Sequence, residues 1–202
     1  DKLGGVLKSV VLGHNVKSIA EDTFKYGVNS AILIEHPALE KYRPLPYSRM
    51  LNKLVNEHKP RILLFGATVV GRGLAPRVAS NTMSGLTADC TELKIEDVSY
   101  LKKDYKDLLL QIRPAFGGNI IATIITPDNP VQMATVREGV MEMHEVDSPF
   151  PISIETVEFV EDTTDDLVKI VKQYREESKV NLKGAPIIVA GGYGLQTKEN
   201  FQ

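Results

Sequence analysis

Residues 62–79 read ILLFGATVVGRGLAPRVA, and this stretch decides the fold. It opens with an uninterrupted apolar run over residues 62–65, which is typical of a strand buried on both faces of a parallel sheet. Residues 66–68 then turn the chain, and apolar residues recur at helical spacing as far as Ala79, with an end near Gly85. A buried strand, a glycine turn and an amphipathic helix in succession predict a βα unit.

Two further units of the same kind precede this stretch. The first consists of an expected strand over residues 6–12 and a helix over residues 16–26. The second consists of a strand over residues 31–34 and a helix over residues 47–58. Three successive βα units with right-handed crossovers predict a parallel sheet, with the carboxyl ends of its strands at one edge.

The pattern changes after residue 86. Apolar runs now follow one another with little helix between them, and short turns favour antiparallel pairing of several of them. The strands expected here cover residues 93–95, 108–112, 120–126, 134–137 and 154–159. A helix over residues 165–179 follows, with Asp165 and Asp166 in its first turn. The predicted fold class is α/β: a mostly parallel sheet of the nucleotide-binding type with crossover helices and an added antiparallel section.

Composition places the chain among globular proteins and excludes several classes. Of its 202 residues 43% are hydrophobic and 25% are charged, and a net charge of -2 offers no broad positive face for nucleic acid or an anionic membrane. Apolar runs such as residues 120–125 are far shorter than the roughly 20 residues that span a bilayer. The four histidines are scattered, so we expect no metal site.

No familiar catalytic motif is present, which indicates that the chain is not a stand-alone catalyst. Cys90 is the one cysteine, so an internal disulfide is excluded. It follows Thr87-Ala88-Asp89, and no histidine stands beside it. We interpret it as a buried small residue at a strand edge rather than as a nucleophile.

Three segments are candidate ligand sites. The glycine-rich turn over residues 66–73 opens a helix whose backbone N–H groups can receive an anion, or it is a tight turn without a ligand. Residues 191–194, Gly-Gly-Tyr-Gly, form a second such turn. Residues 113–118 place Arg113 at a strand end, where its fork-shaped guanidinium can hold a phosphate or stabilise an anionic reduced ring system. The alternative for Arg113 is a surface arginine at a strand exit.

Both ends of the sequence interrupt a βα unit. Residues 1–5 have the pattern of a helix that ends at a glycine, so we expect the first strand of the domain to be missing. At the other end, an apolar strand over residues 185–190 leads to the second glycine turn and to a helix start at residues 197–200. We therefore predict one domain over residues 1–182 and the opening strand and loop of a second, truncated domain over residues 183–202.

Five motifs occur in an order that a known family shares. They are GRGLAPRVA at residues 71–79, GLTADCT at 85–91, RPAFGGNI at 113–120, QMATVR at 132–137, and GGYG at 191–194 with KENF at 198–201. On these motifs the chain resembles the alpha subunit of electron-transfer flavoproteins over most of its length. The resemblance implies that residues 1–182 are the N-terminal domain of the subunit and residues 183–202 the start of its FAD-binding domain.

The resemblance also implies a function and partners. Members of this family pair with a beta subunit and carry electrons through FAD between dehydrogenases, such as acyl-CoA dehydrogenases, and a redox acceptor. The main FAD site of this chain would lie largely beyond Gln202. A second site, held chiefly by the beta subunit, contains AMP in simple electron shuttles and a second FAD in forms that use NADH and bifurcate its electrons.

By position, the resemblance implies cofactor contacts at Arg113 and Phe116 and at the loop formed by Gly192, Tyr193 and Gly194. Tyr193 stands where the family usually has an arginine that contacts FAD. A tyrosine can stack or donate one hydrogen bond but carries no positive charge, so this contact departs from the pattern. The usual Asp is also replaced, by Gly73.

A second class remains open at this stage. Adenine-nucleotide-binding proteins of the universal-stress type share the topology of the first 85 residues, but they do not account for residues 113–119. We expect the protein to act in the bacterial cytoplasm, with the mitochondrial matrix as the alternative. Neither nucleic acid nor insertion into a membrane is expected.

Overall fold

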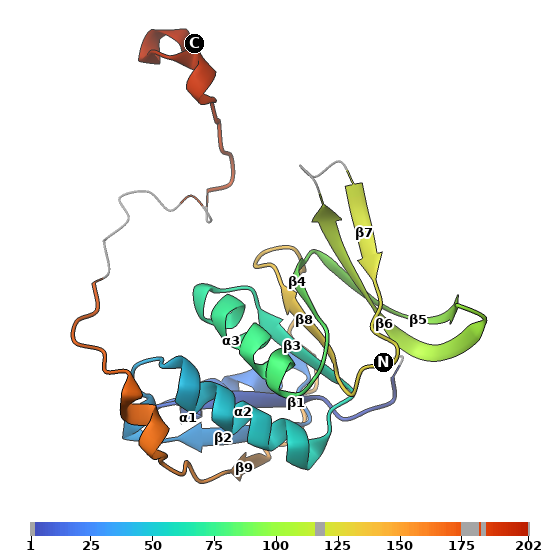
Figure 1. Ribbon diagram of the computed structural model, residues 1–202, viewed down its shortest axis with the longest axis vertical. Coiled ribbons are helices and arrows are strands. Elements are labelled where there is room, and N and C mark those ends of the chain that lie inside the picture. Colours follow the sequence, from blue (N-terminus) through green and yellow to red (C-terminus); the bar gives the residue numbers. More distant parts are fainter. Residues whose placement is uncertain (1–2, 116–119, 175–181, 183–184, 202) are drawn as a thin grey trace. The chain divides into compact units, whose positions relative to one another are not determined.

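The computed structural model describes residues 3–115, 120–174, 182 and 185–201 (Figure 1). The chain forms two compact units, Asp1–Lys169 and Ile170–Gln202. The first unit carries the helices and sheets, and the second contains two short 3₁₀ turns, η5 (Tyr193–Leu195) and η6 (Lys198–Phe201). The predicted domain boundary between residues 182 and 183 stays a prediction.

The first unit is mixed α/β, as its sequence predicts. Its helices, 3₁₀ turns (η) and strands are, in chain order, β1 (Lys8–Gly13), α1 (Lys17–Asp22), η1 (Thr23–Tyr26), β2 (Ser30–Glu35), η2 (Pro37–Leu39), α2 (Pro44–His58), β3 (Ile62–Gly66), α3 (Val69–Asn81), β4 (Leu86–Cys90), β5 (Glu92–Tyr100), β6 (Lys103–Ala115), β7 (Ile120–Ile124), β8 (Gln132–Val136), β9 (Ile154–Thr156) and η4 (Thr163–Leu167).

Within the described residues the strands form three sheets of three strands each. Two are parallel, in the orders β1-β2-β9 and β3-β8-β4, and the third, β5-β6-β7, is antiparallel. The predicted fold class is confirmed, although one continuous parallel sheet was expected and two are present. The strand expected before Asp1 stays a prediction.

Helices cover both faces of the β1-β2-β9 sheet because side chains alternate along a strand. Ile32 and Ile34 of β2 lie in a core that contains residues of α2, α3, β3 and β8, so both parallel sheets share this core. Ala31 and Leu33 face the other way and pack against Ala20 and Phe24 of α1 and η1. Strand β2 is almost wholly buried for this reason.

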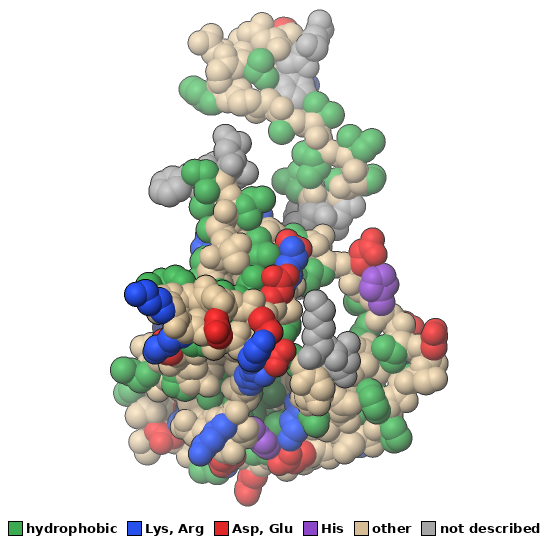
Figure 2. Space-filling model, turned by 90° about the vertical axis from the view of Figure 1, so that its right-hand side faces the viewer, with side chains coloured by type: hydrophobic (Ala, Val, Ile, Leu, Met, Phe, Trp, Pro, Cys, Tyr) green, Lys and Arg blue, Asp and Glu red, His purple; other side chains and the backbone are tan. Residues whose placement is uncertain are grey.

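Charges on the surface are mixed in sign, as the small net charge suggests. Figure 2 shows acidic and basic side chains side by side on one face of the molecule. In the antiparallel sheet, Lys94 pairs with Glu92 at 2.9 Å and Lys106 with Asp97 at 2.5 Å. Such exposed pairs contribute little to stability.

Strand β4 was not expected, because its sequence LTADC is short and carries no clear alternation. It forms because β8, which is far away in the sequence, supplies a parallel partner on one side. The run expected over residues 134–137 corresponds to β8, which pairs in parallel with β3 and β4. The antiparallel pairing expected after residue 86 is confined to β5, β6 and β7.

The helix predicted over residues 165–179 is wrong in its described part. Residues 163–167 form a 3₁₀ turn that a capping box between Asp162 and Asp165 closes, and residues 168–174 have no regular secondary structure. The apolar pattern of this segment would turn Val171 and Tyr174 inward in a helix, but these side chains are open to solvent, at 96% and 81% exposed. An apolar pattern alone does not fix a helix of this length, because an isolated helix of about 15 residues is marginal in water.

The turn from β3 into α3 leads to our first prediction. Gly71 is buried, its N–H donates to Oγ1 of Thr68 at 3.0 Å, and a methyl group on it would overlap with the carbonyl oxygen of Gly66. Gly71→Ala should therefore lower the free energy of unfolding by on the order of 1–3 kcal/mol, because backbone must move. Urea unfolding of the full chain measures this change.

Gly73→Ala is the matched control in the same helix. The nearest atom to its added methyl would be the Tyr42 hydroxyl oxygen, at 3.8 Å, so the methyl has room. An alanine in a helix is favoured over glycine by about 1 kcal/mol, and the variant should be as stable as the original or more so. If both substitutions destabilised the chain equally, the expected clash of the methyl group added at Gly71 with the Gly66 carbonyl would be contradicted.

Candidate cofactor-binding site

The carboxyl ends of β3, β8 and β4 lie at one edge of their sheet, since all three strands run in parallel. The end of β4 is irregular there. Asp89 has a left-handed backbone (φ +57°), and the register with β8 shifts between Thr87 and Cys90. The N–H of Asp89 donates to Oγ1 of Thr135 at 2.8 Å, which holds this bulge against β8.

Three arginines surround the end of β4. Arg72 of α3 donates from Nε to the Asp89 carboxylate at 3.1 Å. The backbone N–H of Arg137, directly after β8, donates to the Cys90 carbonyl at 2.9 Å. The guanidinium of Arg113 on β6 acts electrostatically on the Cys90 thiol. The end of β4 is therefore held by the Arg137 backbone and by an Arg72–Asp89 ion pair, and the Arg113 guanidinium acts on it electrostatically.

Of these three arginines, Arg113 has a side-chain N–H group without a hydrogen-bond acceptor among the described residues. It pairs with Ala122 across β6 and β7, and its side chain is half-buried. Its Nε atom is buried and has no hydrogen-bond partner among the described residues. A buried N–H without an acceptor costs on the order of 1–3 kcal/mol, so an acceptor supplied by a ligand would recover this energy.

Cys90 itself is unsuited to chemistry. It is 0% exposed, and its Sγ lies 3.8 Å from the carbonyl oxygen of Thr87. Burial raises the pKa of its thiol above the ordinary value of 9.0, and the opposing influence of Arg113 is smaller. The sequence-based interpretation of a buried residue at a strand edge is confirmed.

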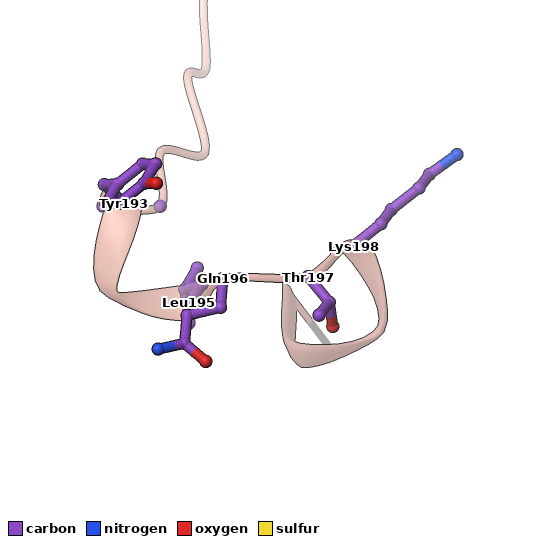
Figure 3. A pocket seen from close by; sticks show the side chains of 7 residues that line it. Tyr193, Leu195, Gln196, Thr197 and Lys198 are labelled. Carbon is purple, nitrogen blue, oxygen red and sulfur yellow. The ribbon is translucent and has the colours of Figure 1, made fainter.

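In the second unit, the glycine turn lines a shallow pocket of ≈ 330 Å³ (Figure 3). Its lining comes from Gly191–Tyr193 and Leu195–Lys198. Tyr193 is 99% exposed at one end of the loop, and the Lys198 side chain points away from it. No atom lies within 4 Å of where a side chain on Gly192 or Gly194 would begin, so a ligand has access to the backbone there.

The predicted cofactor residues therefore fall into two groups. Gly192 and Tyr193 line the pocket of the second unit, Gly194 adjoins it in η5, and Arg113 belongs to the first unit. Phe116 lies outside the described residues. Each of these roles stays a prediction.

Some residues of the site were not singled out from the sequence. Arg72, Asp89 and Arg137 lie within the motifs that carry the family resemblance, but no role was assigned to them. The signal that could have found Arg137 is its place directly after a buried strand, because the ends of parallel strands converge at one edge. Asp89 could be found only from the bulge, which a sequence does not reveal.

Comparison with known proteins decides the family. A family model described as the electron transfer flavoprotein domain matches residues 1–162. The chain belongs to this family. The match includes the motif at residues 113–120, which a universal-stress-type protein leaves unexplained, so that alternative is not favoured.

Individual relatives agree with this membership. The chain is 40% identical over 202 residues to the electron transfer flavoprotein subunit alpha of Thermoanaerobacterium thermosaccharolyticum, covering 100% of this chain and 59% of that protein. It is 43% identical over 204 residues to protein FixB of Clostridium saccharobutylicum, covering 100% and 58%. It is 35% identical over 200 residues to subunit LctC of a lactate dehydrogenase (NAD(+),ferredoxin) of Acetobacterium woodii, covering 98% and 46%.

Two features of other protein classes are missing from the part of the chain that the structure describes. None of its helices has the length and apolar character needed to cross a membrane. No three His, Cys, Asp or Glu side chains gather there in a way that could hold a metal ion.

The burial of Cys90 predicts a specific dependence of stability on pH. The unfolded thiol loses its proton near pH 9, whereas the folded thiol keeps it to higher pH, so the folded state becomes relatively less stable as pH rises above 9. The contribution is up to about 1.4 kcal/mol per pH unit. Cys90→Ala removes it while leaving all other titrating groups in place.

Urea unfolding of the original chain and of Cys90→Ala at pH 7 and pH 10 measures the effect. The alanine variant should start lower at pH 7, because a buried side chain is lost, and should lose less stability than the original on going to pH 10. If the original chain and Cys90→Ala lost the same free energy of unfolding between pH 7 and pH 10, the raised pKa of Cys90 would be contradicted.

Proposed function

We propose that this chain belongs to the alpha subunit of a heterodimeric electron-transfer flavoprotein. Such a protein is an electron carrier, and with a beta subunit it would pass electrons through FAD from a dehydrogenase to a redox acceptor. The observation that carries the proposal is the similarity to relatives named electron transfer flavoprotein subunit alpha along the whole chain. Because the chain spans only 59% of the length of that relative, the activity of the complete protein is part of the proposal.

The residues at the end of β4 fit a flavin. When bound, FAD supplies a ring system that accepts and releases electrons and becomes anionic on reduction. Arg113 would donate from its buried, unpartnered Nε to an acceptor on the ring and favour the reduced, anionic state. Arg72 is already engaged by Asp89, so its role is to fix the loop rather than to meet the cofactor.

The glycine turn of the second unit would hold a different part of FAD. Gly192 and Gly194 leave their backbone open to an approaching group, and the exposed ring of Tyr193 can stack against it or donate one hydrogen bond. Phe116 would contribute from outside the described residues. The rest of the main FAD site would lie beyond Gln202.

The finer points of the proposal concern partners. The donor would be a dehydrogenase of the acyl-CoA dehydrogenase type, and the complex would work in the bacterial cytoplasm. One relative is a lactate dehydrogenase subunit whose name pairs NAD(+) with ferredoxin, which supports a form that bifurcates electrons from NADH. In that form the beta subunit holds a second FAD, and in the simple shuttle it holds AMP.

A nucleotide count on the full-length protein, produced together with its beta subunit, tests the function. Two FAD per heterodimer that NADH reduces would support bifurcation, and one FAD with one AMP would support a simple shuttle. A purified heterodimer without flavin absorbance would overturn the proposal altogether.

Arg113→Gln tests the assigned contact. Loss of a charged hydrogen bond to the reduced ring should lower the potential of one flavin by on the order of 60 mV for a one-electron step, since tenfold in affinity corresponds to about 59 mV. Spectroscopic titration with a reference dye measures the potential.

Arg77→Gln serves as the control for the change of charge. Arg77 lies on the exposed side of α3, and within the described residues no hydrogen bond or ion pair joins it to Arg113, so the variant loses the same charge elsewhere. It should leave the potential within a few mV of the original. Equal shifts in both variants would show a general charge effect and contradict a contact at Arg113.

A further inference from the structure

Asp165 is a buried carboxylate close to the end of the first unit, which closes at Lys169. It lies in η4, drawn in orange in Figure 1, and is 5% exposed. Residues 157–162 before η4 and residues 168–174 after it have no regular secondary structure. A carboxylate is rarely this buried unless a cation or several donors hold it, so Asp165 marks a point at which this segment is fixed.

Two arginines at the start of α2 hold Asp165 from a distant part of the sequence. Nη1 of Arg43 donates to the backbone carbonyl of Asp165 at 2.6 Å, and its Nη2 donates to the carbonyl of Ala38 at 3.3 Å. Nη2 of Arg49 donates to Oδ2 of Asp165 at 2.5 Å, and its guanidinium lies over the ring of Phe159. The backbone and the side chain of Asp165 are therefore both bound to the beginning of α2.

The turn itself closes on the same carboxylate. The N–H of Asp162 donates to Oδ2 of Asp165 at 3.2 Å, and the N–H of Asp165 donates to the carbonyl of Asp162 at 2.9 Å. The N–H of Thr164 donates to Oδ1 of Asp162 at 2.8 Å. Because the turn and the contact with α2 share one carboxylate group, we expect them to form and to open together.

The residues on both sides of this contact are exposed. Before it, Val160 is 56% exposed, and the next buried residue toward the N-terminus is Phe159, which belongs to the core. After it, Leu167 is 74% and Val168 55% exposed. Among the described residues, Asp165 is thus the last buried one before the chain enters the second unit.

The ion pair at Asp165 is incomplete. Nε of Arg49 and Oδ1 of Asp165 are both buried and have no hydrogen-bond partner among the described residues. A bidentate arginine–carboxylate pair would use two N–H groups and both carboxylate oxygens, whereas here one bond is made. A contact with buried atoms left unpaired is easier to open than a complete pair.

We propose that Asp165, Arg43 and Arg49 form a latch that sets the point at which the chain leaves the first unit. With the latch closed, the chain is fixed as far as Asp165. With the latch open, it is fixed only as far as Phe159, and residues 160–165 lengthen the connection to the second unit. A longer connection lowers the effective concentration of one unit around the other. This inference rests on the proposed function, because it makes Asp165 a positioning residue for the unit that carries the proposed FAD loop.

Two neighbouring carboxylates provide a matched pair of variants for the latch. Asp165→Ala removes the buried carboxylate, and Asp166→Ala removes an exposed one whose closest cation, Nη1 of Arg43, is 3.7 Å away. In the full-length protein with its beta subunit, Asp165→Ala should lower the hydrogen-exchange protection of the amides at positions 164 and 165 at least tenfold. Asp166→Ala should leave it within about twofold, and the amide of Val157, bonded to the Leu33 carbonyl, should keep its protection in both.

Arg49→Gln shows whether the two side chains act through one contact. Alone it should also lower the protection at positions 164 and 165, and adding it to Asp165→Ala should change little further, because the contact is already lost. Effects that simply add would mean that the two side chains act separately, and the latch would be refuted.

The reach of the second unit is measured on the same heterodimer. Spin labels at Lys53→Cys in α2 and Lys198→Cys in η6 report the distribution of distances between the units by pulsed electron paramagnetic resonance. The distribution should broaden with Asp165→Ala and should be the same for Asp166→Ala and the original. A distribution that Asp165→Ala leaves unchanged, although protection is lost, would overturn the positioning role.

Flavin content separates this inference from the proposed function. A heterodimer without flavin contradicts the proposed function, whereas a flavin-bound heterodimer whose distances ignore Asp165→Ala contradicts only the latch. Where Asp165→Ala fails to fold, Arg43→Gln takes its place, because it removes the bond to the Asp165 carbonyl and keeps the carboxylate. It should lower the protection at position 165 about threefold or more, and unchanged protection would overturn the proposal.

Discussion

The structure depends on the parallel pairing of β8 with β3 on one side and β4 on the other. Strand β8 lies about 70 residues after β3 in the sequence, yet nearly all of it is buried between its two neighbours. Its side chains also join the antiparallel sheet, because Oε1 of Gln132 accepts from the N–H of Leu109 at 2.8 Å. This strand is therefore one of the links between the parallel sheet and the sheet that carries Arg113.

The same strand shapes the candidate site. Thr135 holds the N–H of Asp89, Arg137 holds the carbonyl of Cys90, and together they keep the end of β4 in its bulged form. A left-handed aspartate is strained, and such strain persists only where its surroundings hold it. The site thus consists of a rigid backbone bulge, which Arg72 fixes from α3, and the side chain of Arg113 beside it.

The sequence predicted those parts of the fold that depend on local periodicity. The strands and helices of the first 85 residues were placed in the correct order, because each has its own apolar pattern, although the helix expected over residues 16–26 is α-helical only over Lys17–Asp22 and continues as a 3₁₀ turn over Thr23–Tyr26. β4 and the helix over residues 165–179 failed for opposite reasons. β4 exists through a distant partner, whereas the expected helix rests on its own apolar pattern alone, and its side chains at Val171 and Tyr174 are exposed. Likewise, Arg113 could be selected by its motif, but the bulge at Asp89 comes from pairing that a sequence does not display.

The charge that a ligand meets at the site depends on which arginines already pair with a carboxylate. Net charge is uninformative here, since a chain with a net charge of -2 still has the side chains of Arg72 and Arg113 at one strand end. Asp89 neutralises Arg72, so the field that a ligand meets comes chiefly from an arginine without such a partner. At about 4 Å and an effective dielectric constant near 20, one such charge acts with about 4 kcal/mol on an anion. Arg113 adds to this a buried N–H in need of an acceptor, and the two terms favour the same occupant: an anionic group with an exposed acceptor atom.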